Sequence, residues 1–306
     1  MGKFYLGHVS YRGTDYYGWQ KQKDLPTLQE EIFNTLRGLY PLGRIDVKAT
    51  SRTDRGVHAF SQVVKFLAPR REEPEDVLKK LNEALPDDIV FNDLIRINKS
   101  FKVTYLSLYK EYLYFFSPKT KVLPYAFVGH WAGTNPLDIE KMKEASQLFV
   151  GKHDFSRFQY RSDAKGGYER EVLETNIFKA QDLFPEAFSS DEGIYCFHVK
   201  GRGFLKQMVR MMVGGLFKYG SGLTTLDEFK TALEGVKTEK KITFIAPAGG
   251  LFLYHIAFPE VLVSDIPRHV VDEKNWLKRD PKLSLWKGKE DMSFPLEVYP
   301  YEPPKD

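Results

Sequence analysis

Residues 44–66, RIDVKATSRTDRGVHAFSQVVKF, decide how the first half of this chain folds. The apolar positions predict strands over 44–50 and 60–66, and the polar, glycine-containing stretch between them predicts a loop. Working outward, the expected order is strand, helix, two strands, helix and strand, over 3–11, 27–40, 44–50, 60–66, 76–85 and 89–97. This β-α-β-β-α-β order is the split βαβ, or ferredoxin-like, unit.

The loop between the two strands carries a candidate reactive group. Asp54 stands between Arg52 and Arg55 in the sequence Thr-Asp-Arg-Gly that follows Arg52. Nearby positive charge favours the ionised form of a carboxyl group, and an ionised, positioned Asp can act as a nucleophile. A solvated charged loop would contain the same residue types, so the loop alone leaves both interpretations open.

Helix-start signals mark one helix in each half of the chain. Thr27 with Glu30 predicts a capping box at the start of helix 27–40, and Thr225 with Glu228 predicts another at a shorter helix. The second half otherwise looks like an elaborated copy of the first. Its expected strands cover 109–116, 125–131, 169–180, 193–200 and 251–258, and its expected helices 138–149, 203–219 and 226–234.

The fold class expected from this order is α/β of the α+β type. Two fused ferredoxin-like halves would share a mixed, mainly antiparallel central sheet flanked by helices, with a cleft along their junction where sites tend to lie. The expected domains are an N-terminal half over 1–105, a C-terminal half over 106–259 and a C-terminal extension over 260–306.

Composition restricts the class of protein. The chain has 306 residues, 42% hydrophobic and 28% charged, as expected for a globular protein with a sizeable core. Its 45 Lys and Arg against 41 Asp and Glu permit a polyanionic partner without requiring one. A single cysteine, Cys196, excludes an internal disulfide and a cysteine-based zinc site. No signal peptide or long apolar run is apparent, so we expect a cytoplasmic protein that does not contact membranes.

Two further segments offer chemistry. Apolar residues cover most of the predicted helix 203–219, whereas Lys206 and Arg210 share one stripe, so Arg210 would lie at the edge of a core and pair with a carboxylate. Asp54 is a candidate partner, and a purely structural ion pair is the alternative. Tyr112 and Tyr114 share one face of a strand, where they can stack on a nucleobase or pack in the core.

Seven short motifs, in register, resemble the TruA family of tRNA pseudouridine synthases. The resemblance runs from about residue 4 to 259. The motifs are Gly13-Thr14 with Tyr17-Gly18-Trp19-Gln20, Thr27-Leu28-Gln29, Arg52-Thr53-Asp54 with Gly56-Val57-His58-Ala59, Lys110-x-Tyr112-x-Tyr114, His153-Asp154-Phe155, Phe204-Leu205 with Met208-Val209-Arg210, and Ala246-Pro247 with Gly249-Gly250-Leu251.

The resemblance implies an enzyme that isomerises uridine to pseudouridine in the anticodon stem-loop of tRNA, in a central RNA-binding cleft, without metal or cofactor. Asp54 matches the catalytic aspartate, and Arg210 the arginine that pairs with it. Tyr112 matches the tyrosine that packs on the target base and takes part in proton removal. The family also implies a homodimer that grips one tRNA.

Four residues are expected to bind substrate. Arg52 matches the arginine that enters the RNA and keeps the target base turned out, and Leu205 would form an apolar wall of the pocket. Arg55 and Lys206 are added as cations beside these motifs.

Some positions depart from the family pattern. Ser51 replaces a usual glycine, Arg55 a smaller residue and Arg12 an acidic one, which affects the choice of substrate more than the reaction. His58 lies in the motif, and we interpret it as structural, with a catalytic role as the alternative.

Other functions stay open on the sequence alone. They are a synthase with other tRNA or RNA targets and a non-catalytic RNA-binding or tRNA-folding protein. A glycoside hydrolase is poorly supported, because that chemistry needs a second acid near the first and no Asp or Glu motif offers one.

Overall fold

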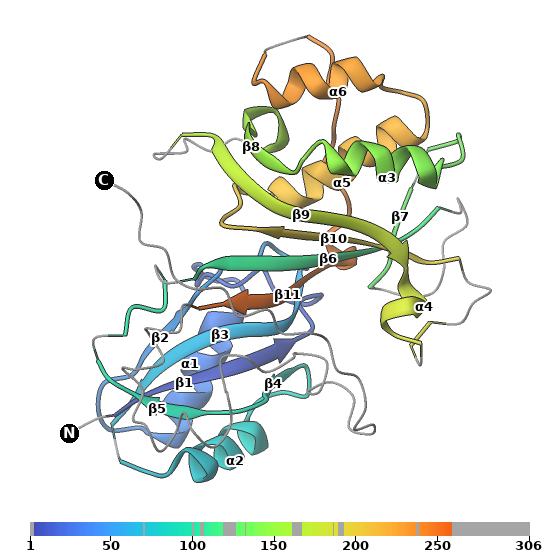
Figure 1. Ribbon diagram of the computed structural model, residues 1–306. Helices are drawn as coiled ribbons and strands as arrows, with labels where there is room; N and C mark the ends of the chain where they lie inside the picture. Colours follow the sequence, from blue (N-terminus) through green and yellow to red (C-terminus); the bar gives the residue numbers. More distant parts are fainter. Residues whose placement is uncertain are drawn as a thin grey trace. The chain divides into compact units, whose positions relative to one another are not determined.

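A computed structural model describes most of the chain between Lys3 and Phe258 (Figure 1). The described residues are 3–69, 71–99, 101–104, 107–118, 127–131, 133–160, 167–185, 187–188, 193–236 and 239–258. The C-terminal extension expected over 260–306 lies outside them, as does the first part of the strand expected over 125–131.

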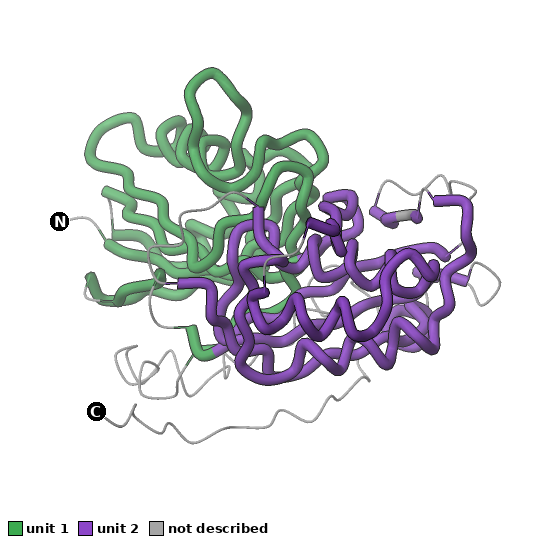
Figure 2. The backbone as a smooth tube through the Cα atoms, turned by 90° about the horizontal axis from the view of Figure 1, so that it is seen from above, with its two compact units in different colours: residues 1–108, 253–306 green, residues 109–252 purple. Residues whose placement is uncertain are grey.

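The chain divides into two compact units (Figure 2). The first combines the residues up to Leu108 with those from Leu253 onward, and the second is Tyr109–Phe252. The domain boundaries expected from the sequence stay a prediction.

In the first unit, β1 (Lys3–Tyr11) is the central strand. It pairs antiparallel with β3 (His58–Ala68) and also with two short strands, β4 (Ile89–Phe91) and β5 (Ile95–Ile97). Strand β2 (Asp46–Ala49) pairs antiparallel with β3. These strands place the end of β2 and the start of β3 on either side of the Asp54 loop.

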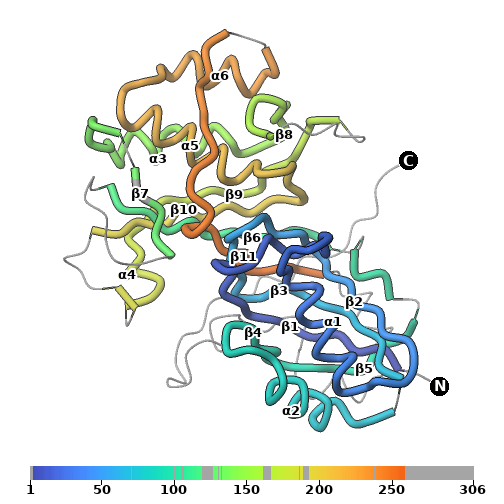
Figure 3. Tube along the Cα trace, turned by 180° about the vertical axis from the view of Figure 1, so that it is seen from behind, coloured from blue at the N-terminus to red at the C-terminus, as the bar shows by residue number. Residues whose placement is uncertain are grey.

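Two helices, α1 (Leu28–Leu39) and α2 (Pro74–Ala84), lie beside the strands of this unit (Figure 3). The apolar stripe of α1 is fully buried, as its spacing predicts: Leu28, Ile32 and Leu36. Tyr5 and Phe66 stack in the same core, with ring centroids 5.4 Å apart.

Two local expectations for the first unit are wrong. The strand expected over 89–97 is interrupted at Asp93, whose carboxylate accepts a hydrogen bond from the backbone N–H of His8 at 3.0 Å. The predicted capping box at Thr27 does not form. The Thr27 side chain makes no cap bond to a described residue, and Glu30 instead pairs with Lys21, with 2.9 Å between Oε1 and Nζ.

The second unit is built on four antiparallel strands in the order β6 (Tyr109–Ser117), β10 (Tyr195–Gly201), β9 (Glu169–Lys179) and β8 (Gly151–Asp154). The short strand β7 (Gly129–His130) runs parallel to β6. Helices α3 (Ile139–Gln147), α5 (Met208–Gly220), α6 (Leu226–Leu233) and the short α4 (Ala180–Leu183) complete it. Its last residues begin β11 (Leu251–Ala257), which continues into the first unit.

Aromatic side chains fill the core of the second unit. Phe149 lies against Phe158 and Phe229, with ring centroids 5.3 and 5.2 Å away. Cys196 is fully buried and acts as a small core residue, and burial raises the pKa of its thiol well above the ordinary value.

The structure confirms one helix start in this unit and corrects another. The capping box of α6 forms, because Thr225 Oγ1 accepts from the Glu228 N–H at 3.3 Å and Glu228 Oε2 accepts from the Thr225 N–H at 2.9 Å. The helix expected from residue 203 begins only at Met208, because Gln207 has a left-handed φ of 59°. Strand β8 was not expected from the sequence.

The fold class expected from the sequence is confirmed. The chain is mixed α/β, with a large, mostly antiparallel and partly parallel sheet flanked by helices (Figure 1). Among the described residues, no helix combines the length and the apolar character that crossing a bilayer requires.

Candidate active site

The loop that carries Asp54 follows β2 and leads into β3. Its first residues are tied to β3, because Ser51 donates its backbone N–H to Gln62 Oε1 at 3.2 Å and accepts from Gln62 Nε2 at 2.8 Å. The turn closes where the Val57 N–H donates to the Asp54 carbonyl at 3.1 Å, with Gly56 at a φ of 75°. The backbone on both sides of Asp54 is therefore fixed by hydrogen bonds.

A second segment, residues 13–19, packs against this loop. The loop and this segment together are here called the platform. The Trp19 N–H donates to the Thr53 carbonyl at 3.0 Å, and the Gly56 N–H donates to the Tyr16 carbonyl at 3.2 Å. The two backbones approach so closely that a Cβ atom at Gly18 would lie 2.6 Å from the Thr53 carbonyl oxygen. The sequence showed these glycines as a family motif, but not this contact.

The charged residues of the loop differ in exposure. Asp54 is half-buried, whereas Arg52 and Arg55 are exposed. The Arg55 guanidinium lies over the ring of Tyr17, 4.0 Å from its centroid, which makes a cation–π contact with the second segment of the platform. Arg55 is thus held to the platform while it remains accessible to a ligand.

His58 lies behind the loop and is buried. Its Nδ1 accepts a hydrogen bond from the Gly13 N–H at 3.2 Å, so its ring joins the two backbone segments of the platform. This contact supports the structural interpretation of His58 over the catalytic one.

In the second unit, Tyr112 and Tyr114 share one face of β6 but have different surroundings. Tyr112 is buried and meets Phe204 edge-on, with ring centroids 5.2 Å apart. Tyr114 is fully buried and donates its hydroxyl to the Pro247 carbonyl at 2.9 Å. Burial raises the pKa of Tyr114, although the nearby Arg210 charge acts in the opposite direction. Tyr114 is therefore a neutral anchor.

Arg210 lies in the first turn of α5 and is half-buried. Its Nε donates to the Ala246 carbonyl at 2.7 Å, and the Ala246 N–H donates back to the Arg210 carbonyl at 3.2 Å. This two-way connection sets the direction of the guanidinium. The backbone next to Pro247 therefore holds both Arg210 and Tyr114, a role that the sequence motif did not reveal.

The segment before α5 carries the other two predicted residues. Leu205 is buried, and its N–H points to the sulfur of Met208 at 3.4 Å. Lys206 is exposed, with Nζ 6.0 Å from the centroid of the Tyr160 ring. Lys206 lies outside the helix, contrary to expectation, so it does not share a helical stripe with Arg210.

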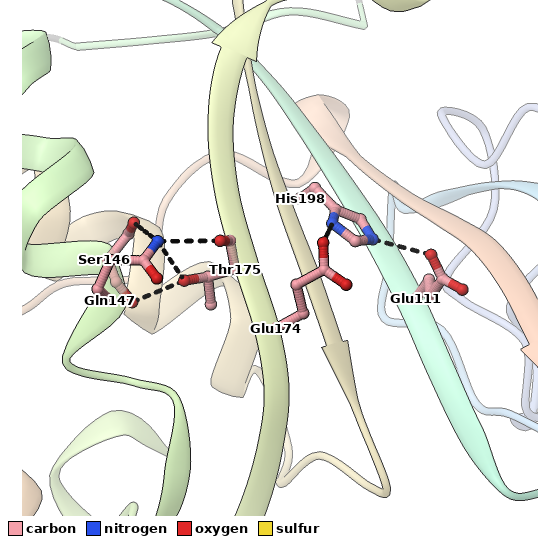
Figure 4. Close-up of polar contacts among 6 residues, drawn as sticks. All are labelled: Glu111, Ser146, Gln147, Glu174, Thr175 and His198. Carbon is pink, nitrogen blue, oxygen red and sulfur yellow. Dashed lines mark hydrogen bonds and ion pairs between the residues drawn. The ribbon is translucent and has the colours of Figure 1, made fainter. Parts of the chain in front are cut away.

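In the second unit, the sheet face opposite to that of Tyr112 carries a separate charged group (Figure 4). His198 lies between Glu111, 2.8 Å from its Nε2, and Glu174, 4.0 Å from its Nδ1. Glu111 and Tyr112 are adjacent on β6, so their side chains point to opposite faces. Within the described parts of the chain, no group of three or more His, Cys, Asp or Glu side chains could hold a metal ion.

The predicted site residues thus belong to two sets. Asp54, Arg52 and Arg55 lie in the first unit. The second unit holds the other four, Tyr112, Leu205, Lys206 and Arg210. The pairing of Asp54 with Arg210 stays a prediction.

Comparison with known proteins places these segments in a family. A sequence model described as tRNA pseudouridine synthase matches residues 8–105 and 145–259, which include Asp54 and Arg210. Several relatives carry the name tRNA pseudouridine synthase A. The chain is 34% identical to the one from Chlamydia muridarum over 85% of its own length and 93% of the relative. It is 35% identical to the one from Phytoplasma mali over 82% and 96%, and 34% identical to the one from Pseudothermotoga lettingae over 84% and 100%.

The match covers both units and nearly the whole length of each relative, so it is not limited to one motif. Six of the seven motifs found in the sequence lie within the matched ranges, and the one at residues 110–114 lies between them. The chain belongs to the tRNA pseudouridine synthase family.

Proposed function

We propose that this chain isomerises uridine to pseudouridine in the anticodon stem-loop of tRNA, with Asp54 as the catalytic residue. The observation that carries the proposal is the platform of the first unit. It holds one half-buried carboxylate between two exposed arginines, on a loop fixed by hydrogen bonds at both ends. A binding protein has no physical need for a carboxylate held in this way, whereas a nucleophile must be positioned.

The reaction rearranges bonds without a net change in composition. The bond between N1 and C1′ breaks, C1′ is joined to C5, C5 loses a proton, and N1 gains one. Asp54 would initiate cleavage at C1′. The base must leave its stack before C1′ is accessible, at a cost of a few kcal/mol. Cations that enter the RNA and an aromatic side chain that stacks on the base would offset this cost.

The remaining predicted residues have roles that their surroundings support. Arg210 would pair with Asp54, and its Nε anchor on Ala246 leaves the guanidinium in a defined direction. Tyr112 would pack on the extruded base and take part in proton removal. Leu205 would form an apolar wall. Three exposed cations would contact the RNA: Arg52, Arg55 and Lys206.

We also propose that the protein acts as a cytoplasmic homodimer in which two subunits grip one tRNA. The support is the family resemblance. Light scattering of the purified chain with and without tRNA tests this separately: a mass of one chain per tRNA would contradict it.

The central experiment replaces Asp54 by Asn. Pseudouridine formation is measured as tritium release from tRNA labelled at C5 of uridine, and tRNA binding by filter retention. We expect the variant to lose at least about 10⁴-fold in rate, because the nucleophile is removed. Binding should be largely retained, because the amide has the same shape.

A matched control is Asp76→Asn. Asp76 lies in the first turn of α2, outside the platform, and is exposed. Its rate should stay near that of the wild type. If Asp54→Asn retains the rate, Asp54 is not the catalytic residue. If the wild type binds tRNA without releasing tritium, the chain is a binding protein. Either result contradicts the proposal.

A further inference from the structure

A second, strongly basic site lies in the first unit, away from the Asp54 loop. It is a groove of about 740 Å³, here called the basic groove, formed by the ends of β1, β2, β3 and β5 and the segment after β5. Its cationic lining residues are Lys3, Arg44, Lys48, Lys65, Lys99 and Lys102.

The groove concentrates the positive charge of the chain. Among its described lining residues, six cations face the single carboxylate of Asp46, which leaves a formal charge of +5. The whole chain carries only +4, so all its other residues together are close to neutral. Asp46 offsets part of this charge through its ion pair with Lys48, with 3.3 Å between Oδ2 and Nζ. Such a concentration attracts anions before contact and lowers their energy once bound.

The fold builds this site from strand alternation. Lys48 and Lys65 are opposite each other in the register of β2 and β3, and their neighbours Val47 and Phe66 form the adjacent opposite pair. Because side chains alternate along a strand, the two lysines point away from the core face that Phe66 shares with Tyr5. The basic face is thus a direct consequence of the register.

Lys65 links β3 to the segment that follows β5. It is buried, and its Nζ donates to the carbonyls of Lys99 at 2.8 Å and Phe101 at 2.6 Å. The same Nζ lies 4.5 Å from the centroid of the Phe4 ring. Burial and the neighbouring Lys48 charge lower the pKa of Lys65, so a bound anion would relieve an existing cost. Lys65 is therefore a positioning residue that holds the segment carrying Lys99.

The ligand chemistry follows from the residue types. Five of the six cations are lysines, which act as point charges rather than as the planar forks that read carboxylates or bases. Contacts of this kind neutralise phosphates without reading sequence. Lys48 precedes Asp54 by six residues in the chain, an extended span of at most about 22 Å. The near end of the groove therefore lies within that distance of Asp54.

We propose that the basic groove binds the phosphodiester backbone of the same tRNA whose anticodon arm reaches Asp54, an inference that rests on the proposed function. The groove supplies affinity and orientation, and the Asp54 platform supplies chemistry.

The test is a charge-removal variant, Lys48→Gln with Lys99→Gln and Lys102→Gln. All three side chains are exposed, so the fold should be retained, which thermal unfolding checks. We expect tRNA to bind at least about tenfold more weakly near 0.15 M salt. The magnitude of the slope of log K against log salt should fall by about two to three, because each of the three lost phosphate contacts lowers it by about 0.7 to 0.9.

The matched control removes the same charge elsewhere. Lys79→Gln with Lys80→Gln and Lys141→Gln changes three exposed lysines on α2 and α3. Its affinity and salt slope should stay close to those of the wild type. If the two triple variants bind tRNA equally well, the position of the lysines does not matter and the proposal is wrong.

Two further arms separate the remaining outcomes. ATP, added at constant ionic strength, distinguishes RNA phosphates from a free nucleotide. If ATP binds the wild type but not the groove variant, while tRNA binds both equally well, the groove is a nucleotide site and the proposal is overturned. Tritium release by the wild type is measured in parallel. Its absence would overturn the proposed function, whereas the difference in salt slope between the two variants would still identify the groove as an RNA site.

Discussion

The two units hold their site residues by different means. In the first, backbone-to-backbone bonds from Trp19 to Thr53 and from Gly56 to Tyr16 position the Asp54 loop. In the second, the side chains themselves make the connection, as when Arg210 Nε donates to a carbonyl. Apart from the reactive Asp54 side chain, substitutions in the first unit should therefore act through the fit of the two backbone segments, and those in the second through the lost side-chain group.

Among the substitutions that test this comparison, the largest expected effect is in the second unit. Arg210→Lys keeps the charge but removes the Nε–H donor to Ala246, so the charge is no longer directed. We expect kcat to fall about 10²-fold to 10³-fold, as for loss of one preorganised donor. Tritium release at saturating tRNA measures it.

Arg157→Gln is the control for Arg210. Arg157 also donates to backbone carbonyls, to that of Val236 at 3.2 Å and to that of Lys240 at 2.8 Å, but it is not a predicted site residue. Its kcat should change little. Equal losses in the two variants would mean that Arg210 acts only through folding.

The next effect tests how closely the two backbone segments of the platform pack in the first unit. Gly18 has a φ of 90° and a Cβ there would approach the Thr53 carbonyl oxygen to 2.6 Å, so Gly18→Ala adds strain and a clash. We expect the free energy of unfolding to fall by about 2 to 3 kcal/mol. Denaturant unfolding measures this change, and tritium release should fall with it.

Gly38→Ala should have the opposite sign. Gly38 is in α1, and a Cβ there would meet no described heavy atom within 4 Å. Replacing a helical glycine by alanine stabilises by about 0.5 to 1 kcal/mol. If both variants behave alike, the close approach at Gly18 is not what holds the platform.

A smaller effect concerns the buried tyrosine of the second unit. Tyr114→Phe leaves the Pro247 carbonyl without its 2.9 Å hydrogen bond. The free energy of unfolding should fall by about 1 to 2 kcal/mol, as measured in urea. A variant that is as stable as the wild type would show that the hydroxyl does not anchor this segment.

The smallest effect is a pH dependence that both units share. The pKa of Tyr16 is raised by burial and by its hydrogen bond to Asp88, and the pKa of Tyr114 is raised by burial. Above pH about 10 the unfolded chain loses these protons while the folded chain keeps them, so stability is lost as pH rises. Each tyrosine contributes at most about 1.4 kcal/mol per pH unit. Urea unfolding of Tyr16→Phe and Tyr114→Phe at several pH values separates the two contributions, and an unchanged slope in both would contradict this account.

The sequence predicts elements well where local pattern and tertiary contacts agree. β1 has the expected bounds, and the buried stripe of α1 has the expected spacing. The capping box of α6 also forms, because Thr225 and Glu228 are close in the chain, and it forms although Glu228 also pairs with Lys240. Elsewhere distant residues intervene: Lys21 takes Glu30 from the other capping box, and His8 bonds Asp93 where a continuous strand was expected.

For the candidate site, residue types and their order were enough to single out the Asp54 loop and Arg210, because charged residues within short motifs can be recognised from the sequence alone. The platform beneath Asp54, the carbonyl that directs Arg210 and the lysines gathered in the basic groove were not visible. Each depends on segments far apart in the chain, and a glycine or a lysine looks the same in sequence whether or not another backbone lies against it. Only the folded register of strands and loops decides those contacts.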